Sequence, residues 1–468
     1  MSKRVYSGSL RMVLLLTAAA TLSCATVVHA QTDDDADTEK RLQQLEKTVR
    51  EINKDTRKLE VAEEDRTKAK PWGGWNLKDG FFLQSTDGAY KLKIGGYVQN
   101  DGRFFIDNED DKTKSQFTVR RARLDIRGTL AQYFEFRLLP DFAGGKMVLQ
   151  DAYVDAKYIP EAFVRVGKLK QPVGLERLQS ATSLLFIERA LPTQLVPNRD
   201  LGVFLMGDIA RSVFSYQLGI ADGVPDGKSN DNDTDLNSDK DFVGRVFGQP
   251  LLNSSVEALR GLGFGISGTY GRQQSNVSSP DMPTYKTSGQ ATFFQYRSDS
   301  PATGAGTTVA DGAHYRYSPQ AYYYFGPFGF LTEYVASTQR VLRGPDSKEI
   351  TNTAWQIRAS YVLTGENDSF KGLVPAADFN PFRGTWGAWQ VAARYSHLNV
   401  DNDAFSDGFA DPAKSATSAD EWAIGLNWYL NPNVLWALNF DRTTFHGGDG
   451  TGNRDPENLL VTRVQFLF

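Results

Sequence analysis

The last ten residues of the chain, LLVTRVQFLF, alternate between two kinds of side chain. Every second residue from Leu460 to Phe468 is apolar or threonine, whereas Arg463 and Gln465 hold intervening positions. The period of two in a β-strand puts these sets on opposite faces. Such a strand fits the closing strand of a transmembrane β-barrel, with one face toward lipid and the other toward a wet lumen. An edge strand of a soluble sheet would alternate in the same way, so other segments have to decide.

Residues 1–30 have the pattern of a secretory signal peptide. Lys3, Arg4 and Arg11 form a basic region around the start of an apolar run, and Ala30 follows at the spacing of a cleavage site. Cys24 is the only cysteine, and the preceding TLS is a poor context for lipoprotein processing, so cleavage after Ala30 is preferred. A mature chain without cysteine excludes a disulfide framework and a thiolate metal site.

The composition of the mature chain suits a β-barrel. Aromatic residues make up 12% of the sequence and glycines number 42, as expected for short strands with aromatic girdles and tight turns. No run of 18 apolar residues follows the signal, so no transmembrane helix is expected. Removing three of the 52 basic residues with the signal leaves 49 against 56 acidic residues, a net charge of −7. A nucleic-acid binder would show a basic excess instead.

Residues 31–70 are polar and highly charged, with one apolar seam. The seam has the spacing 3-4-3-4-3 and consists of Leu42, Leu45, Val49, Ile52, Thr56 and Leu59. This a/d spacing predicts an oligomeric coiled coil of about three heptads, which we expect at the periplasmic end. A single amphipathic helix lying on the following domain is the alternative, because so short a coiled coil is marginal alone. Pro71 then ends the helix.

From Trp75 onward the sequence alternates between strands and turns. Four clear segments carry apolar or aromatic residues on one face and polar residues on the other: 91–103, 354–363, 389–398 and 422–430. Wide apolar faces opposite charged ones suit a barrel with a wet interior. At about 25 residues per strand and connection, the domain 71–468 is predicted to be an all-β, antiparallel transmembrane barrel of roughly 16 strands.

The densest group of charges lies in one expected strand, VRRARLDIR. Arg121, Arg123 and Arg127 share the face opposite the apolar residues, and Asp125 partly neutralises this column. Arg120 has the other parity and needs a β-bulge or a position near the start of the strand. Guanidinium groups offer a planar fork of donors to phosphate, so anion binding is one interpretation. The other is wall electrostatics, in which these arginines pair with carboxylates of neighbouring strands. The candidate carboxylates are Glu135, Asp151 and Asp155.

Eight motifs follow one another along residues 80–468. In sequence order they are Phe117-x-x-Arg120-Arg121-Ala122-Arg123, Asp141–Gly144, Leu149-x-Asp151-Ala152-Tyr153, Val166–Glu176, Phe186–Ala190, Arg199–Gly202, Tyr361–Glu366 and Asn427–Pro432. This series resembles the phosphate-selective porins of the O and P type. Each motif alone is weak, but eight in register are specific to that family.

The resemblance implies a trimeric, 16-stranded channel in the outer membrane, surrounded by lipid and lipopolysaccharide, that conducts phosphate or polyphosphate. Carried over by position, Arg120, Arg121 and Arg123 belong to the pore-lining set, which Arg127 joins by parity. An inward loop between Lys170 and Arg199 should form the constriction. Its candidate donors are Lys168, Lys170, Arg177, Ser180 and Ser183. The acidic mature chain departs from a strongly basic pore, so a general diffusion porin is the alternative.

Other functions fit less well. The mature histidines are only His314, His397 and His446 and no G-x-S-x-G element is present, so neither catalysis nor a cofactor is expected. A sugar porin would use an aromatic slide, but the consecutive aromatics Tyr322–Phe325 alternate faces and favour an interfacial girdle. A structural tether would explain the coiled coil and not the inward arginines. The acidic loop 231–239 lacks the glycine and glutamate of a calcium loop, so no metal site is expected.

Overall fold

The computed structural model describes residues 41–54, 72–76, 80–106, 114–210, 212–231, 238–298 and 306–468. The chain divides into two compact units, Met1–Ala69 and Lys70–Phe468, and each is treated by itself. The expected signal peptide, both ends of the predicted coiled coil and positions 232–237 of the acidic loop lie outside the described residues. In the first unit, residues 41–54 form a helix that exposes four seam residues. No helix among the described ranges is long and apolar enough to cross a membrane.

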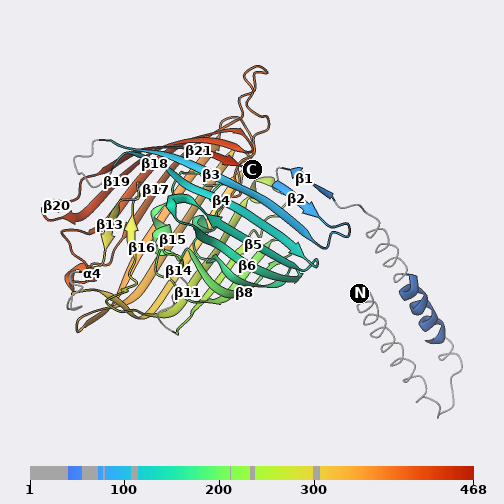
Figure 1. Ribbon diagram of the computed structural model, residues 1–468, viewed down its shortest axis with the longest axis horizontal. Helices are drawn as coiled ribbons and strands as arrows, with labels where there is room; N and C mark the ends of the chain where they lie inside the picture. The colour runs from blue at the N-terminus through green and yellow to red at the C-terminus, as the bar shows by residue number, and fades with distance from the viewer. Residues whose placement is uncertain are drawn as a thin grey trace, which may run out of the picture. The chain divides into compact units, whose positions relative to one another are not determined.

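Sixteen strands of the second unit form a closed antiparallel ring (Figure 1). In ring order they are β3(Lys91–Ile106), β4(Gln116–Leu130), β5(Phe134–Asp141), β6(Val148–Ile159), β7(Ala162–Lys170), β8(Arg199–Ile209), β9(Phe214–Ala221), β10(Asp241–Gly248), β11(Leu262–Gln274), β14(Val309–Phe325), β15(Phe328–Arg343), β16(Asp346–Val362), β17(Ala388–Asn399), β18(Ala416–Asn431), β19(Val434–Asp449) and β21(Glu457–Leu467). Pairing of β21 with β3 closes the ring. The predicted all-β barrel of about 16 strands is confirmed.

The remaining elements are short. In the 19-stranded sheet, β1(Trp72–Asn76) and β2(Gly80–Gln84) form a hairpin that extends β3, and β20(Gly452–Asn453) pairs with β19. A separate hairpin consists of β12(Thr284–Lys286) and β13(Thr292–Gln295). The helical turns are η1(Ala143–Gly145), α3(Leu175–Leu178), η2(Leu191–Leu195), η3(Glu257–Leu259) and α4(Asp403–Ser406).

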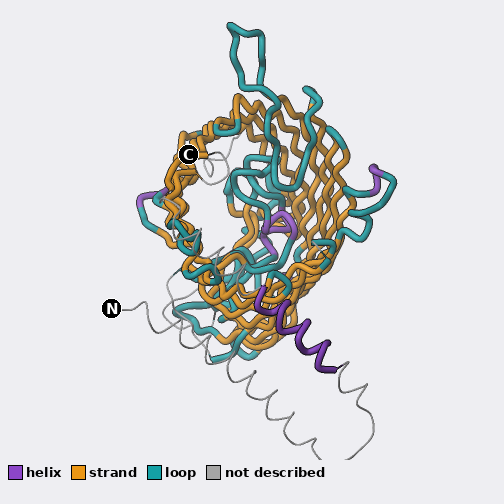
Figure 2. Tube along the Cα trace, turned by 90° about the vertical axis from the view of Figure 1, so that its right-hand side faces the viewer, coloured by secondary structure: helices purple, strands orange, loops and turns teal. Residues whose placement is uncertain are grey.

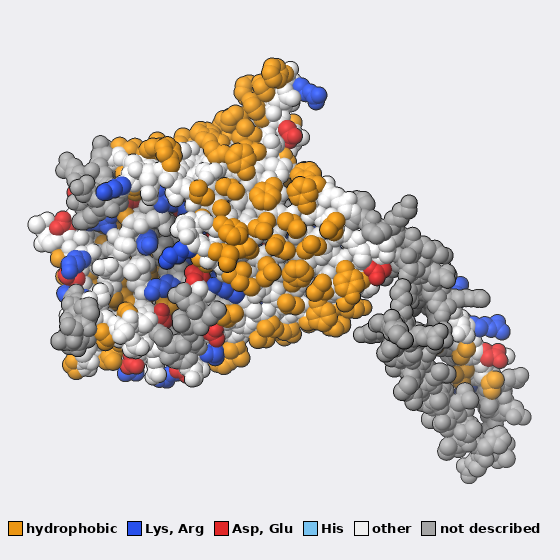
Figure 3. Space-filling model, in the orientation of Figure 1, with side chains coloured by type: hydrophobic (Ala, Val, Ile, Leu, Met, Phe, Trp, Pro, Cys, Tyr) orange, Lys and Arg blue, Asp and Glu red, His pale blue; other side chains and the backbone are white. Residues whose placement is uncertain are grey.

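The barrel wall is apolar outside and polar inside. On β21, Arg463 and Gln465 are each only 3% exposed, whereas Val464 and Phe466 are exposed on the outer face. Figure 3 shows the resulting apolar band around the strands. A soluble protein would bury the apolar set, so this inverted polarity is that of a wall in contact with lipid. The alternation predicted for the end of the chain is confirmed.

The last strand closes the barrel through charge and main-chain contacts. The Arg463 guanidinium donates to both carboxylate oxygens of Asp101 on β3, at 2.7 and 2.8 Å. At the carboxyl end of the chain the Phe468 amide donates to the Gly96 carbonyl, and the Gly96 amide donates to a main-chain oxygen of Phe468 at 2.9 Å. A side chain at Gly96 would meet the Phe468 ring at 2.6 Å, so glycine is required where the ring crosses β3.

Connections differ in length between the two rims of the barrel. At the rim where β21 ends, most are short turns, such as 131–133, 160–161 and 432–433. At the other rim, the third connection spans 171–198 and the fifth spans 275–308. We call these the third and fifth loops. Figure 2 shows loops gathered inside the ring and displaced toward one side of it.

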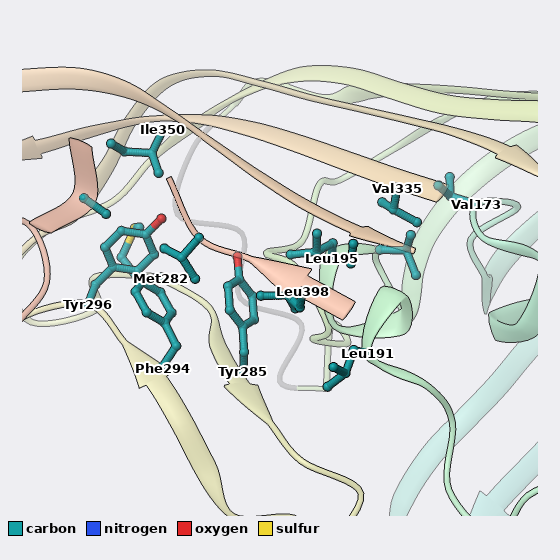
Figure 4. Packing of buried hydrophobic residues seen from close by; sticks show 14 of the residues in the cluster. Val173, Leu191, Leu195, Met282, Tyr285, Phe294, Tyr296, Val335, Ile350 and Leu398 are labelled. Atoms are coloured by element: carbon teal, nitrogen blue, oxygen red, sulfur yellow. The ribbon is translucent and has the colours of Figure 1, made fainter. Parts of the chain in front are cut away.

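The third and fifth loops share an apolar cluster inside the lumen (Figure 4). Leu191 and Leu195 of the third loop and Phe294 of the fifth loop are buried in it, together with wall residues Val335 and Leu398. Burial of this apolar surface holds both loops against the β14–β18 side of the wall. The prediction of an inward loop between Lys170 and Arg199 is confirmed.

Replacing Arg463 with methionine should destabilise the barrel. The change leaves Asp101, which is 2% exposed, without its bidentate partner, at a cost of about 3–5 kcal/mol. Urea unfolding of the refolded protein in lipid vesicles measures this loss. Arg442→Met is the control, because Arg442 is exposed and donates only to Asn458, so its midpoint should stay close to that of the unaltered protein. Equal midpoints for both variants would contradict the expectation.

Candidate functional site

Strand β4 directs a column of arginines into the lumen. Arg121 and Arg123 are buried, at 4% and 9% exposure, and Arg127 follows on the same face. Arg120 lies at the expected β-bulge, because Gln99 pairs with Arg121 and the next β3 residue pairs with Val119. Two guanidinium nitrogens of Arg120 donate to the Glu188 carboxylate, which belongs to the third loop. Of the two placements that parity left open, a bulge or a position near the start of the strand, the structure has the bulge.

The carboxylates that pair with this column differ from those predicted. Arg123 donates to Asp141 at 2.7 Å, and Arg127 bonds to Asp125 on its own strand. Arg120 bonds to Glu188. The predicted partners serve other cations: Asp151 pairs with Arg137 and Arg199, Asp155 with Arg165, and Glu135 with Lys157. The prediction of these three as partners of the β4 column is wrong. Asp151 and Asp155 lie on β6, within reach of cations on β5, β7 and β8, and Glu135 on β5 pairs with Lys157 of β6 although it lies opposite Thr129 of β4.

Two carboxylates hold the third loop across the lumen. Glu176 accepts a 2.6 Å hydrogen bond from Arg358 on β16. Glu188 accepts bonds from Arg120 on β4, at 2.5 Å, and from Arg103 on β3, at 3.2 Å. Because β16 lies on a different side of the ring from β3 and β4, Glu176 and Glu188 anchor the third loop to two separate parts of the wall.

Glu188 remains ionised at its buried position. Burial would raise the pKa of the Glu188 carboxyl, but the Arg120 and Arg121 guanidinium groups outweigh burial and hold this pKa well below its usual range. An unperturbed glutamate titrates near about 4.3. The stabilising contribution of this carboxylate is therefore fully present above that pH and is lost only as the pH falls through the depressed pKa.

The loop leaves two cavities along the arginine-bearing wall. A cavity of about 550 Å³ lies toward the long loops and is lined by Arg121, Arg177 and Arg189 among others. A cavity of about 460 Å³ lies toward the rim where β21 ends and is lined by Arg127 and Arg137 among others. Both lie along β3–β8, where Leu169 and Met206 of the apolar cluster also line the cavity of about 460 Å³.

Three residues line both cavities, and all three are basic. They are Arg123 on β4, Lys170 at the end of β7 and Arg199 at the start of β8. Lys170 and Arg199 are direct cross-strand partners. Like charges opposite each other are destabilising, and Asp151 offsets this by accepting from Arg199 at 2.7 Å. The boundary between the cavities, which would be the passage of a channel, therefore has a cationic lining.

Cations beside this passage bond to carbonyl groups and not to carboxylates. Lys170 donates to the Gln179 carbonyl at 2.8 Å, Arg189 to the Glu176 and Gln179 carbonyls, and Arg177 to the Thr193 carbonyl. Among the described residues, none of the three forms a carboxylate ion pair. Burial, with Arg189 and Arg199 nearby, lowers the pKa of Arg177 to about 9, so it stays charged at neutral pH. This cluster carries positive charge that an anion would offset.

The sequence-predicted donors divide into two groups. Arg120, Arg121, Arg123, Arg127, Lys170, Arg177 and Ser180 line one or both cavities. Lys168 and Ser183 line neither of the two: Lys168 bonds to Asp231 at 3.0 Å, and Ser183 lies against Gly372. Because the loop turns sharply after α3, Ser180 and Ser183 face different surroundings.

Four further cavity-lining arginines had no prediction as donors: Arg137, Arg165, Arg189 and Arg199. Arg199 could have been found, because it follows the loop directly and must oppose Lys170 if the flanking strands pair. Arg137 and Arg165 are each the only arginine of their strand, so no run of arginines marks them. Arg165 is stacked on the Tyr153 ring at 3.8 Å, a contact that only the cross-strand register creates. In the described part of the chain, no His, Cys, Asp and Glu group suits a metal ion.

Residues 92–468 match the family described as phosphate-selective porin O and P. The chain belongs to this family. Porin O of Pseudomonas aeruginosa is 24% identical over 418 residues, which cover 84% of this chain and 91% of that protein. The porin family and the closed barrel place the protein in the outer membrane and point to a channel rather than an enzyme.

Solved structures show the same fold at low sequence identity. Outer-membrane expressed OmpT of Vibrio cholerae aligns with a TM-score of 0.52 and 12% identity, over 81% of this porin and 98% of that chain. The outer membrane channel DcaP of Acinetobacter baumannii aligns with a TM-score of 0.50 and 12% identity, over the same shares. At these identities the likeness concerns the barrel alone.

Glu188→Gln should increase the preference of the porin for anions. The change removes one negative charge from a group of four arginines, of which Arg121 and Arg463 lie 3.9 Å from this carboxylate. The reversal potential across a planar bilayer under a potassium chloride gradient should move toward that of chloride. Glu366→Gln, outside the lumen, serves as the control. An unchanged reversal potential for Glu188→Gln would mean that solvent screens the cluster.

Proposed function

We propose that this porin is an anion-selective channel through which phosphate or polyphosphate diffuses passively. The observation that carries the proposal is that the two cavities meet only at basic residues, Arg123, Lys170 and Arg199. Guanidinium groups and the lysine ammonium form charge-assisted hydrogen bonds with phosphate oxygens. Membership of the phosphate-selective family supports the same substrate class.

The arrangement favours anions over cations by its unpaired charge. Most wall arginines, such as Arg165 with Asp155, are neutralised locally and act as a stiff polar surface. Arg177 and Arg189 donate their hydrogen bonds to carbonyl groups and not to carboxylates, so their charges remain available to a permeant ion. In a narrow passage such charges are screened less than the same charges in a wide, wet pore.

A sugar-type diffusion porin is the weaker candidate. Its aromatic slide would need ring faces along the passage, but Tyr322 packs against Phe247 and Phe370, with ring centroids 5.1 and 5.4 Å away. Tyr323 contacts Phe328 instead, in keeping with the expected alternation of faces. None of these rings lines the two cavities described above.

Lys170→Gln should weaken block of chloride current by phosphate. Loss of one charge-assisted donor at the passage costs about 1.5–3 kcal/mol, which corresponds to roughly a 10- to 150-fold higher half-blocking concentration. Single-channel recording in planar bilayers with added inorganic phosphate measures this. Arg442→Gln, on the exposed face of β19, is the matched control and should leave block unchanged. If phosphate fails to block even the unaltered porin, the phosphate preference is wrong and a general diffusion pore remains.

We further propose a homotrimer with the segment 31–70 on the periplasmic side. OmpT of Vibrio cholerae has a solved trimer form with a TM-score of 0.50 to this chain, which supports that oligomeric state. The helix 41–54 exposes Leu42, Leu45, Val49 and Ile52, each at more than half of its area. Association of three such helices would bury this seam.

Leu45→Asp with Val49→Asp should abolish helix association and leave the channel intact. Charges at a and d positions oppose packing of the seam, whereas the barrel closes without this segment. Cross-linking through residue 43, changed to cysteine, should lose its trimer product. Single-channel conductance of the same preparation should equal that of the unaltered porin. A collapse of conductance would show that the segment is part of the barrel and not a separate module.

A further inference from the structure

The longest connection on the short-turn rim first touches the third loop inside the barrel, where Gln179 donates to the Phe370 carbonyl at 2.8 Å, and then forms an arm outside the barrel. It spans residues 363–387, between β16 and β17. Figures 1 and 2 show it projecting away from the wall at the top of each view. Its tip is a tight turn in which Asn380 and Thr385 exchange main-chain hydrogen bonds at 2.9 and 3.1 Å. The Asn380 side chain also accepts from the amides of Phe382 and Arg383.

This turn presents an aromatic ring and a cation. Phe382 is 98% exposed, the most exposed large apolar residue among those described. Arg383 beside it is also exposed and forms no ion pair with any residue that the structure describes. Because the turn is held by its own hydrogen bonds, binding of the tip would cost little conformational entropy. We call Phe382 and Arg383 the arm tip.

The base of the arm lies at the level of an aromatic cluster on the outer wall. Phe379 packs edge-on against Trp428, and the Trp428 indole donates to the Trp386 carbonyl at 2.8 Å. Trp389 stacks on Trp428 with centroids 4.8 Å apart. Figure 3 shows the arm rising from the apolar band. Irregular main chain is not left exposed to hydrocarbon, so a protein surface is the environment that suits the arm.

A complementary patch lies on the same rim, at β5 and β6. Tyr133 and Tyr158 stack with centroids 4.7 Å apart, and Phe134 packs edge-on against Tyr158. All three rings are exposed outside the barrel. Glu161, in the next turn, is exposed and forms no ion pair within the described part of the chain. The patch therefore offers aromatic faces and a negative charge to the positive, aromatic arm tip.

We infer that the arm tip docks on the Tyr133–Phe134–Tyr158 patch of a neighbouring copy, an inference that rests on the trimer in the proposed function. Phe382 packs on the tyrosine rings, and Arg383 pairs with Glu161. Going around the ring from β17 to β5, five strands lie in between: β18, β19, β21, β3 and β4. Arm and patch thus lie within one half of the circumference, where both can face a common symmetry axis. Repetition of this head-to-tail contact closes a ring.

A cysteine pair tests the contact in the assembled porin. The only native cysteine, Cys24, lies in the predicted signal peptide, so introduced cysteines report alone. Phe382→Cys combined with Tyr158→Cys, treated in outer membranes with a short bismaleimide, should give covalent dimers and trimers that survive boiling. Each single variant should give none. The control pair is Phe382→Cys with Phe117→Cys, because Phe117 is 81% exposed but lies at the opposite rim.

Charge exchange gives an independent measurement. Arg383→Glu should lower the temperature at which the trimer dissociates, and adding Glu161→Arg should restore it. If the Phe382–Tyr158 pair cross-links no better than the control pair while a conducting trimer persists, the docking is wrong and the proposed function stands. If the porin migrates as a monomer in native gels and this monomer conducts in bilayers, both the trimer and the docking are wrong. Labelling of the arm tip by a lipid-borne photoreactive group, without interchain products, would assign it to the membrane.

Discussion

The pathway through this porin depends on the two carboxylates that hold the third loop inside the barrel. Glu176 binds Arg358 on one side of the lumen, and Glu188 binds Arg103 and Arg120 on another. Both carboxylates are almost fully buried, so breaking either contact would leave an uncompensated charge in a poorly solvated place. With the loop fixed in this way, the lumen holds two cavities that share three basic lining residues, Arg123, Lys170 and Arg199.

The loops also make the lumen asymmetric. The apolar cluster packs the third and fifth loops against wall residues such as Val335 and Leu398, and the two cavities lie along β3–β8. The proposed anion pathway therefore runs past the wall that carries the arginines. The acidic balance of the whole chain is consequently a poor guide to the pathway, because solvent screens distant surface charges within about 8–10 Å at physiological salt. Local, partly buried charges at Lys170 and Arg177 count for more.

Periodicity predicted much of the fold, because the two faces of each strand meet opposite environments. The alternation at Arg463 and Gln465 followed from parity alone, whereas for Arg120 parity left a bulge or a position near the start of the strand, and the structure has the bulge. The position of the inward loop followed from family motifs. Asp141 and Glu188 were not foreseen as partners of the arginine column, because pairing depends on register between strands and on the path of a loop. Ser183 illustrates the same limit, since its neighbour Gly372 is remote in the chain.

The sequence by itself determined that this protein is a barrel with a polar interior, because a period of two survives any choice of strand register. It also determined which residue types reach the lumen, including the arginines of β4. Only the tertiary structure decided which of those charges are neutralised and which remain available. Asp155 neutralises the charge of Arg165, whereas Arg189 bonds to carbonyl groups, which leave its charge uncompensated. The reason is that charge compensation is set by distances of a few ångströms between segments far apart in the chain.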